Sequence, residues 1–167
     1  MEISEILTKR LVLKKPSPVD AKALYLELNN REVAKWITRL PEPYTLSEAE
    51  SWVDVISHMK LNFNIFLHDV LIGGAGLVAT AEGHHELGFW LGESSWRKGY
   101  ATEAVHALLQ HASTHHEGKK VVAGCLRDNV RSLKILQGFG FDIQGEDEIF
   151  CHPQGKTLPR LRLSLTL

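Results

Sequence analysis

Apolar residues recur with helical spacing over one stretch in the second half of the chain. Between positions 101 and 112 they fall at i, i+3, i+4, i+7, i+8 and i+11, which is one face of an α-helix. Directly before it, residues 86–91 form a short apolar run with two aromatic residues, typical of a buried strand. The polar segment 92–98 joins the two. The pattern therefore predicts a strand, a turn and a long helix.

The first half of the chain mixes helix and strand signals. Ser17 followed by Pro18 predicts a helix start, and Thr45 with Glu48 forms a capping box for a helix that runs to about Lys60. A short helix is expected between them. Strands are predicted at residues 10–14, 62–67 and 70–78, the last two joined by a tight turn into a hairpin. Glycines at positions 73, 74 and 76 indicate a bulge or a close backbone approach.

After the long helix, the pattern returns to strands. A β-branched run predicts a buried strand at residues 120–126, and a helix follows from Asn129 to about Gln137. Two more strands complete the chain, and in the last, at 160–167, leucine alternates with polar residues. With no repeat or linker in sight, we expect one α+β domain over residues 1–167, with a mixed, mostly antiparallel central sheet flanked by helices.

The turn at residues 92–99 predicts a site for a diphosphate. Unpaired N–H groups and the positive end of the helix dipole favour phosphate at a helix start. Arg97 and Lys98 add positive charge, and the small residues Gly99 and Ala101 let a ligand approach the main chain. The alternative is a glycine turn with two solvated bases. Neither G-x-x-x-x-G-K-[ST] nor a dinucleotide-binding G-x-G-x-x-G is present.

The segment WRKGYATEA at residues 96–104 resembles the acetyl-CoA loop of the GNAT N-acetyltransferases, and more narrowly the RimJ/RimL group, in which Trp commonly stands at the position of Trp96. Arg97 replaces the Gly that is most frequent in that group. A second motif fits N-x-x-S-x-x-x-L-x-x-x-G-F; its residues are Asn129, Ser132, Leu136, Gly140 and Phe141. The resemblance covers nearly the whole chain and implies the GNAT fold.

The resemblance implies acetyl-CoA as the cofactor and a set of residues that bind it. This set is Trp90, Leu91, Arg97, Lys98, Gly99, Tyr100, Ala101, Thr102 and Asn129. A backbone N–H at or close to Leu91 is expected to stabilise the oxyanion on the acetyl carbonyl. Asn129 is expected to hold the pantetheine arm, and as an Asn at a helix start it is also a good N-cap.

The same resemblance implies direct attack of an amine on the thioester. The Tyr that often supplies the proton to the leaving thiolate is replaced by Leu136, so Ser132 is the candidate acid; its alternative role is a hydrogen bond at the helix start. For the base, His85 and Glu86 are candidates, and only one should face the acceptor because adjacent strand residues point to opposite sides. The alternatives are Glu148 and His152.

Aromatic residues surround the proline-rich loop at residues 40–44. Trp36, Tyr44 and Trp52 pack helices together in the simplest interpretation. In GNAT proteins this region forms a wall of the acceptor site, so Trp36 and Tyr44 are candidate substrate-binding residues. The acceptor is either a protein N-terminal α-amino group or a small-molecule amine such as a polyamine or an aminoglycoside. The rival interpretation is a non-catalytic acyl-CoA-binding sensor of the same fold.

Composition sets further bounds. The 167 residues are 44% hydrophobic and 23% charged, with a formal net charge of -1, so nothing global favours nucleic acid or an anionic membrane. Two distant cysteines and no signal-peptide pattern predict a soluble cytoplasmic protein with reduced thiols. The family resemblance implies a monomer or a homodimer. His111 and His115 have metal-ligand spacing without a third ligand, so no metal is predicted. Glu103 is expected to be structural.

Overall fold

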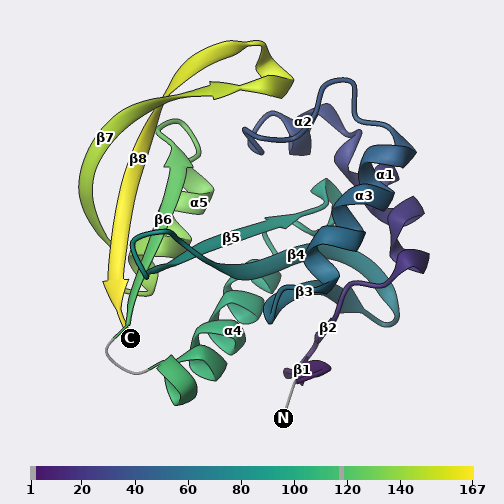
Figure 1. Cartoon of the computed structure of the whole chain (residues 1–167), viewed down its shortest axis with the longest axis horizontal. Coiled ribbons are helices and arrows are strands. Elements are labelled where there is room, and N and C mark those ends of the chain that lie inside the picture. The colour runs from purple at the N-terminus through teal and green to yellow at the C-terminus, as the bar shows by residue number, and fades with distance from the viewer. Residues whose placement is uncertain (1–2, 117–118) are drawn as a thin grey trace.

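This computed structural model of the protein describes residues 3–116 and 119–167, with the side chains of His115 and His116 left aside. Within those residues one sheet of eight strands has the order β1-β2-β3-β4-β5-β6-β8-β7 (Figure 1). The strands are β1 (Glu5–Leu7), β2 (Val12–Lys14), β3 (Leu61–Leu67), β4 (Val70–Ala79), β5 (His85–Leu91), β6 (Lys120–Leu126), β7 (Asp142–Cys151) and β8 (Lys156–Thr166).

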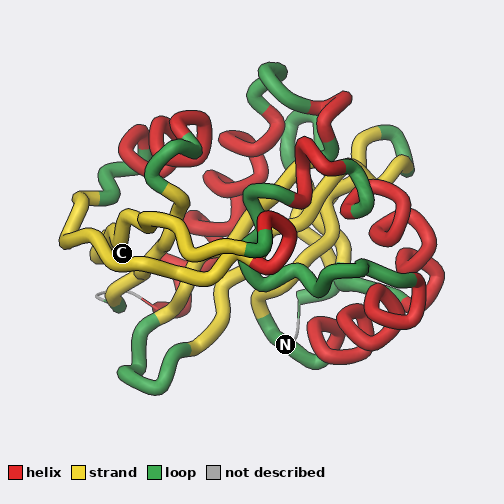
Figure 2. The backbone as a smooth tube through the Cα atoms, turned by 90° about the horizontal axis from the view of Figure 1, so that it is seen from above, coloured by secondary structure: helices red, strands yellow, loops and turns green. Residues whose placement is uncertain are grey.

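The helices are α1 (Ala21–Leu28), α2 (Arg31–Ala34), α3 (Leu46–Ser57), α4 (Tyr100–His116) and α5 (Val130–Gly138). Short 3-10 turns occupy Pro18–Asp20, Glu93–Ser95 and His152–Gln154. Helices lie on both sides of the strands (Figure 2). None of the described helices is both long enough and apolar enough to cross a membrane.

The strands are antiparallel except for one pair at the centre of the sheet. Strands β5 and β6 run parallel, and they pair only where His85 meets Val121 and Glu86 meets Val122. Beyond these positions the two strands diverge, which Figure 1 shows as an opening between them. The predicted α+β class and mostly antiparallel sheet are confirmed, and the opening divides the sheet into two halves.

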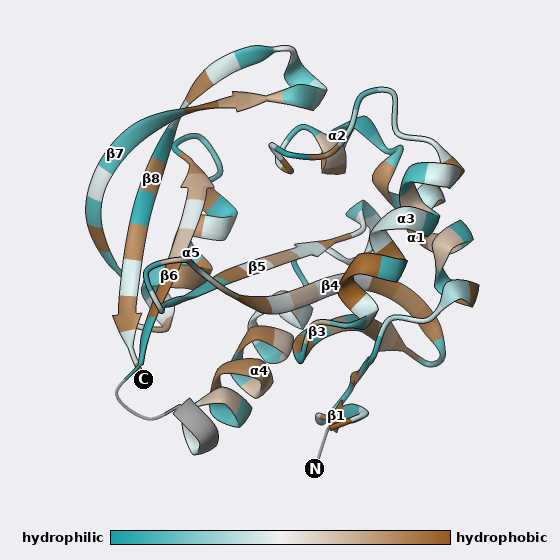
Figure 3. Cartoon of the chain, in the orientation of Figure 1, coloured by the Kyte–Doolittle hydropathy of each residue, from teal (hydrophilic) through white to brown (hydrophobic). Residues whose placement is uncertain are grey.

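Two hydrophobic clusters cover the two faces of the sheet. The larger one packs α4 and α5 on the strands, with Val105, Leu108 and Leu163 almost fully buried. The smaller one joins α1, α2 and α3 to the sheet and includes Leu71 of β4, whereas Ile72 belongs to the larger cluster. Along β8 apolar and polar residues alternate, as predicted, and Figure 3 shows this as coloured bands.

At the two ends of the chain the structure differs from the sequence prediction, by one strand that was not predicted and one that begins earlier. The three-residue β1 was not predicted, because so short a strand has no measurable period; it pairs with β2 alone at the sheet edge. Strand β8 begins at Lys156 rather than at 160, although it contains Pro159. The carbonyl of Pro159 accepts from the Arg127 N–H, on the side away from β7. Because the nitrogen and the carbonyl of one strand residue point to the same side, the nitrogen of Pro159 also faces away from β7. Its missing N–H therefore costs no hydrogen bond to β7.

The glycine-rich part of β4 contains both features that the sequence suggested as alternatives, a bulge and a close backbone approach. The register of β3 against β4 shifts between Ile65 and Phe66, opposite Ile72, which is a β-bulge. Beside it, a Cβ on Gly73 would contact the backbone carbonyl oxygen of Trp90, and one on Gly74 would lie 2.8 Å from Trp90 Nε1. Strand β4 can therefore lie against the end of β5 only because these side chains are absent.

We expect Gly73→Ala to destabilise the fold by about 1–3 kcal/mol, because the new methyl group meets a backbone atom that cannot rotate away. Gly88→Ala, in the adjacent strand, is the matched control, since a Cβ there has nothing within 4 Å. The control should change stability by less than about 1 kcal/mol. Urea unfolding of the two variants measures this, and equal loss in both would contradict the close approach.

Candidate functional site

The divergence of β5 and β6 opens a cavity of about 770 Å³, a volume in the range of small-molecule sites. Its walls come from both strands, from the first turns of α4 and α5, from the segment that follows α2, and from α3. Residues from the whole length of the chain thus meet at one opening in the sheet.

Most of the residues predicted to bind a cofactor line this cavity. They are Trp90, Leu91, Arg97, Gly99, Tyr100, Ala101, Thr102 and Asn129. Lys98 does not; its Nζ instead donates to the Ser94 carbonyl at 2.8 Å. The cavity therefore brings the start of α4 and the start of α5 to the same space, and the roles of these residues in binding stay predictions.

Two left-handed residues turn the chain into α4. Gly99 has φ 79° and Arg97 has φ 61°, a conformation that costs any residue with a Cβ about 1–2 kcal/mol. The need for this conformation explains why Gly is the common residue at the position of Arg97 in the resembling group. The Arg97 side chain is exposed, so it meets no packed neighbour that would exclude it.

An arginine from the N-terminal segment braces the start of α4. Arg10 Nε lies 2.6 Å from Glu103 Oε2, Arg10 Nη1 donates to the Lys98 carbonyl at 2.9 Å, and the guanidinium lies 4.6 Å from the Tyr100 ring centre. Thr8 Oγ1 also donates to Glu103, at 2.6 Å. Burial alone would raise the pKa of Glu103, but the hydrogen bonds from Thr8 and Arg10 outweigh it and lower that pKa. Glu103 is structural, as predicted, whereas no sequence pattern indicated Arg10.

Trp96 connects three parts of the site. Its Nε1 donates to the Leu91 carbonyl at 2.8 Å, which joins the loop to the end of β5. The Arg131 guanidinium stacks 3.8 Å from the centre of the Trp96 ring, which joins the same loop to α5. The indole therefore fixes the loop relative to both walls of the cavity.

The Leu91 N–H is directed into the opening between β5 and β6. The next N–H, that of Gly92, donates to the Ile72 carbonyl of β4 at 2.8 Å. Because successive residues of a strand direct their backbone groups to alternate sides, the Leu91 N–H faces away from β4. A backbone donor in this position can stabilise negative charge that develops on a bound carbonyl oxygen.

The start of α5 supplies two polar side chains to the cavity. The Asn129 Oδ1 accepts from the Ser132 N–H at 3.3 Å, so Asn129 is the N-cap of this helix, and both residues line the cavity. Leu136, at the position where the resembling family often has Tyr, is only 1% exposed and packs in the core. Ser132 is thus the hydroxyl that α5 presents to the opening.

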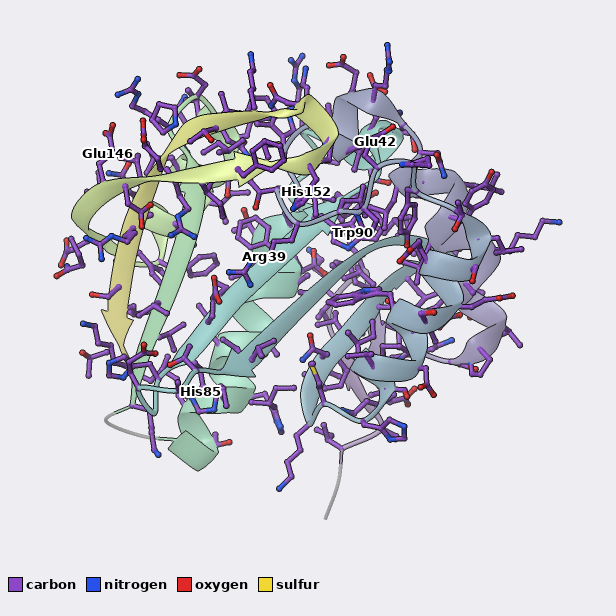
Figure 4. All side chains as sticks on the ribbon, turned by 45° about the horizontal axis from the view of Figure 1, so that its top comes forward. Arg39, Glu42, His85, Trp90, Glu146 and His152 are labelled. Carbon is purple, nitrogen blue, oxygen red and sulfur yellow. The ribbon has the colours of Figure 1, made fainter. Side chains whose placement is uncertain are left out.

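Of the two adjacent candidates for a base, only Glu86 lines the cavity. His85 does not line it, and Figure 4 shows His85 at the far end of β5 from Trp90. Of these two residues, Glu86 is therefore the one that the cavity exposes to a ligand, and its role as the base stays a prediction. The alternatives Glu148 and His152 also lie outside the cavity lining, and the His152 ring packs edge-on against Phe150, with centroids 5.1 Å apart.

The aromatic residues around the proline-rich loop divide into two groups. Trp36 and Trp52 line the cavity, and the Trp36 Nε1 is buried without a hydrogen-bond partner among the described residues. Tyr44 does not line it; the side chain is 6% exposed and packs with α1 and α3. Burial and the nearby Glu48 carboxylate raise the pKa of Tyr44 to about 12. Any contribution of Tyr44 to the wall is therefore indirect, through packing.

Among the described residues, no group of three or more His, Cys, Asp and Glu side chains could hold a metal ion. The His111–His115 pair cannot be placed, because the His115 side chain lies outside the described part of the chain.

A family model for the acetyltransferase (GNAT) domain matches residues 10–142. The chain is 29% identical over 150 residues to an N-acetyltransferase of Bacillus licheniformis named p20, and the match covers 84% of this chain and 83% of the relative.

Solved structures share the fold at lower identity. A GNAT-family acetyltransferase from Bacillus anthracis superposes with a TM-score of 0.83 at 22% identity, covering 97% of this chain and 98% of that one. The RimL ribosomal α-N-protein acetyltransferase in complex with coenzyme A superposes with a TM-score of 0.82 at 18% identity, covering 98% of each chain.

We expect Glu103→Gln to destabilise the fold by about 1–2 kcal/mol at neutral pH, because the charged hydrogen bonds to Arg10 are lost. The folded-state pKa of Glu103 lies below its ordinary value of 4.5, so the stabilisation is present above that value and disappears as pH falls through the lower, folded-state pKa.

Urea unfolding of wild type and Glu103→Gln between pH 7 and pH 3 measures this difference. Glu50→Gln, at an exposed position on α3, is the control and should leave stability nearly unchanged. If the difference in free energy of unfolding between wild type and Glu103→Gln stayed constant down to pH 3, the charge of Glu103 would not be what stabilises the loop.

Proposed function

The chain belongs to the GNAT acetyltransferase family, and from that premise we propose that it transfers the acetyl group of acetyl-CoA to the amine of an acceptor. The observation that carries the proposal is the cavity at the divergence of β5 and β6, into which the starts of both α4 and α5 open. Acetyl-CoA supplies the acetyl group as a thioester; everything else in the reaction falls to residues of this chain.

In this proposal the start of α4 binds the diphosphate of acetyl-CoA. The unpaired N–H groups after Gly99 and the helix dipole attract the phosphates, and the exposed Arg97 adds a cation beside them. Asn129 supplies an amide to the pantetheine arm while it caps α5. The contacts of Arg10 with Glu103 and the Lys98 carbonyl preorganise the loop before α4 for ligand binding.

The chemical step needs a neutral amine, a donor to the carbonyl oxygen and a proton for the leaving thiolate. The Leu91 N–H is the proposed donor to the carbonyl oxygen, because it is directed into the opening. Glu86 is the proposed base; because it lies five strand positions, about 16 Å, from Leu91, it acts on the amine through bound water. Ser132 is the proposed source of the proton for the thiolate, since it is the α5 hydroxyl that lines the cavity.

The proposed acceptor is an amine, either the α-amino group of a protein N-terminus or a small molecule. The likeness to RimL, whose described activity is on a ribosomal protein N-terminus, supports the first class. The alternative function, a non-catalytic acyl-CoA-binding module, draws support from Leu136, since a buried Leu cannot act as the acid that the family often uses.

Release of free thiol from acetyl-CoA by the purified protein tests the proposal. The acceptor panel contains N-terminal peptides, amino acids, polyamines and aminoglycosides. We expect turnover with at least one class. Acetyl-CoA binding by calorimetry without thiol release from any class would favour the non-catalytic module, and absence of binding would contradict both functions.

We expect Glu86→Gln to lower kcat by about 100-fold or more, the range that general bases contribute, with little change in the KM for acetyl-CoA. His85→Gln is the matched control, one residue away on the same strand but outside the cavity lining, and should retain kcat within a few fold. Steady-state kinetics on both variants decide the assignment. A larger loss of kcat in His85→Gln than in Glu86→Gln would assign the role of the base to His85.

A further inference from the structure

The part of the cavity away from α4 and α5 has a distinct chemical character. Its walls include the aromatic side chains Trp36, Trp52 and Phe89, and the arginines Arg39 and Arg160. Glu86 contributes a carboxylate, the one acidic side chain among the described residues that line the cavity. A ligand in this region therefore meets flat apolar surfaces, two guanidinium groups and one negative charge.

The charge of Arg160 is already balanced within the protein. Its Nε and Nη2 donate to the two oxygens of Asp147 at 2.8 and 2.7 Å, a bidentate pair between β8 and β7. Hydrogen bonds to Asp147 raise the pKa of Arg160, and the charge of Glu86 acts in the same direction. Arg162 Nε also lies 3.5 Å from Asp147, so two arginines face the carboxylates of Asp147 and Glu86, and Arg160 offers a ligand little net charge.

Arg39 has no such partner. It lies in the segment between α2 and α3, its side chain is exposed, and no acidic group of the described residues lies within ion-pair distance. It nevertheless lines the cavity, and Figure 4 shows it between the tip of the β7–β8 hairpin, near His152, and strand β5. An uncompensated guanidinium at the edge of a partly apolar cavity is suited to pairing with an anion.

The position of Arg39 is set by contacts between two distant segments. The His152 N–H donates to the Thr38 carbonyl at 2.9 Å, next to Arg39, and Gln154 Nε2 donates to the Lys35 carbonyl at 2.8 Å. The tip of the β7–β8 hairpin is therefore tied to the segment after α2, over the cavity. These bonds hold the backbone next to Arg39 in place at the edge of the cavity.

We propose that the acceptor carries, besides its amine, a carboxylate or a phosphate that pairs with Arg39, while Glu86 faces the amine. This inference rests on the proposed acetyl transfer. It disfavours polyamines and aminoglycosides, because a second ammonium group would meet Arg39 and find no further carboxylate in the described lining. An apolar or aromatic body between the two charged ends would contact Trp36 and Phe89.

The test measures thiol release from acetyl-CoA with acceptors that differ in the anionic group, and kcat/KM is referred to the neutral-amine fraction of each acceptor, because a carboxylate and an amide give the neighbouring amine different pKa values. The pairs are phenylalanine and phenylalaninamide, phosphoserine amide and serine amide, and a short peptide with a second-position Asp and its Asn counterpart. Spermidine represents the polycations. The three pairs separate a carboxylate on a small molecule, a phosphate, and an acidic peptide as sources of the anion.

We expect the anionic member of at least one pair to exceed its neutral partner by about 10-fold or more in kcat/KM. Arg39→Gln should remove this preference by raising the KM for the anionic acceptor, with the neutral acceptor unaffected, and Arg39→Lys should restore part of it. Arg31→Gln, an exposed arginine on α2 outside the cavity lining, is the matched control and should change nothing.

Turnover that is equal for acid and amide, or greatest with spermidine, would overturn the inference and leave the acetyl transfer standing. A preference for the anion that survives in Arg39→Gln would likewise overturn it. Absence of turnover with every acceptor would instead contradict the proposed function on which the inference rests.

Discussion

The separation of β5 from β6 is the constraint on which the rest of the site depends. Two parallel strands at the centre of a sheet normally pair along their length, yet these two pair at only two positions and then part. Backbone groups that would otherwise bond across the pair, such as the Leu91 N–H, face the opening instead. Because buried backbone groups need partners, such an opening is suited to a ligand that supplies them.

The separation is maintained by contacts on both sides of it. On one side, β4 follows β5 closely because Gly73 and Gly74 leave room for the Trp90 backbone and indole. On the other side, Trp96 bonds the Leu91 carbonyl and stacks under Arg131 of α5. The N-terminal segment adds Arg10, which fixes the loop before α4 through Glu103 and Lys98. Distant parts of the chain therefore converge to hold one gap in shape.

The sequence predicts most of the fold because its signals are local. The period of residues 101–112, the capping box at Thr45 and the alternation in β8 each specify one element, and the structure contains them. The predicted parity of His85 and Glu86 allowed only one of them to face the acceptor. Which of the two lines the cavity depends on elements from both halves of the chain, and no local pattern carries that information.

What the sequence could not predict was set by long-range contacts. Arg10 lies more than 80 residues from the loop that it braces, and Arg39 is positioned by the β7–β8 tip. Tyr44 was a candidate for contact with the acceptor, but the helices α1 and α3 bury its side chain instead. Charged and aromatic side chains in loops have no period, so their partners become known only from the structure.

A crystal structure of the protein with acetyl-CoA bound would show directly whether the gap holds the ligand. We expect the diphosphate at the start of α4 and the thioester in the gap between β5 and β6, with its carbonyl oxygen about 3 Å from the Leu91 nitrogen. A thioester bound outside this gap, or a gap that closes when the ligand binds, would contradict the central claim that the divergence of these strands forms the reaction site.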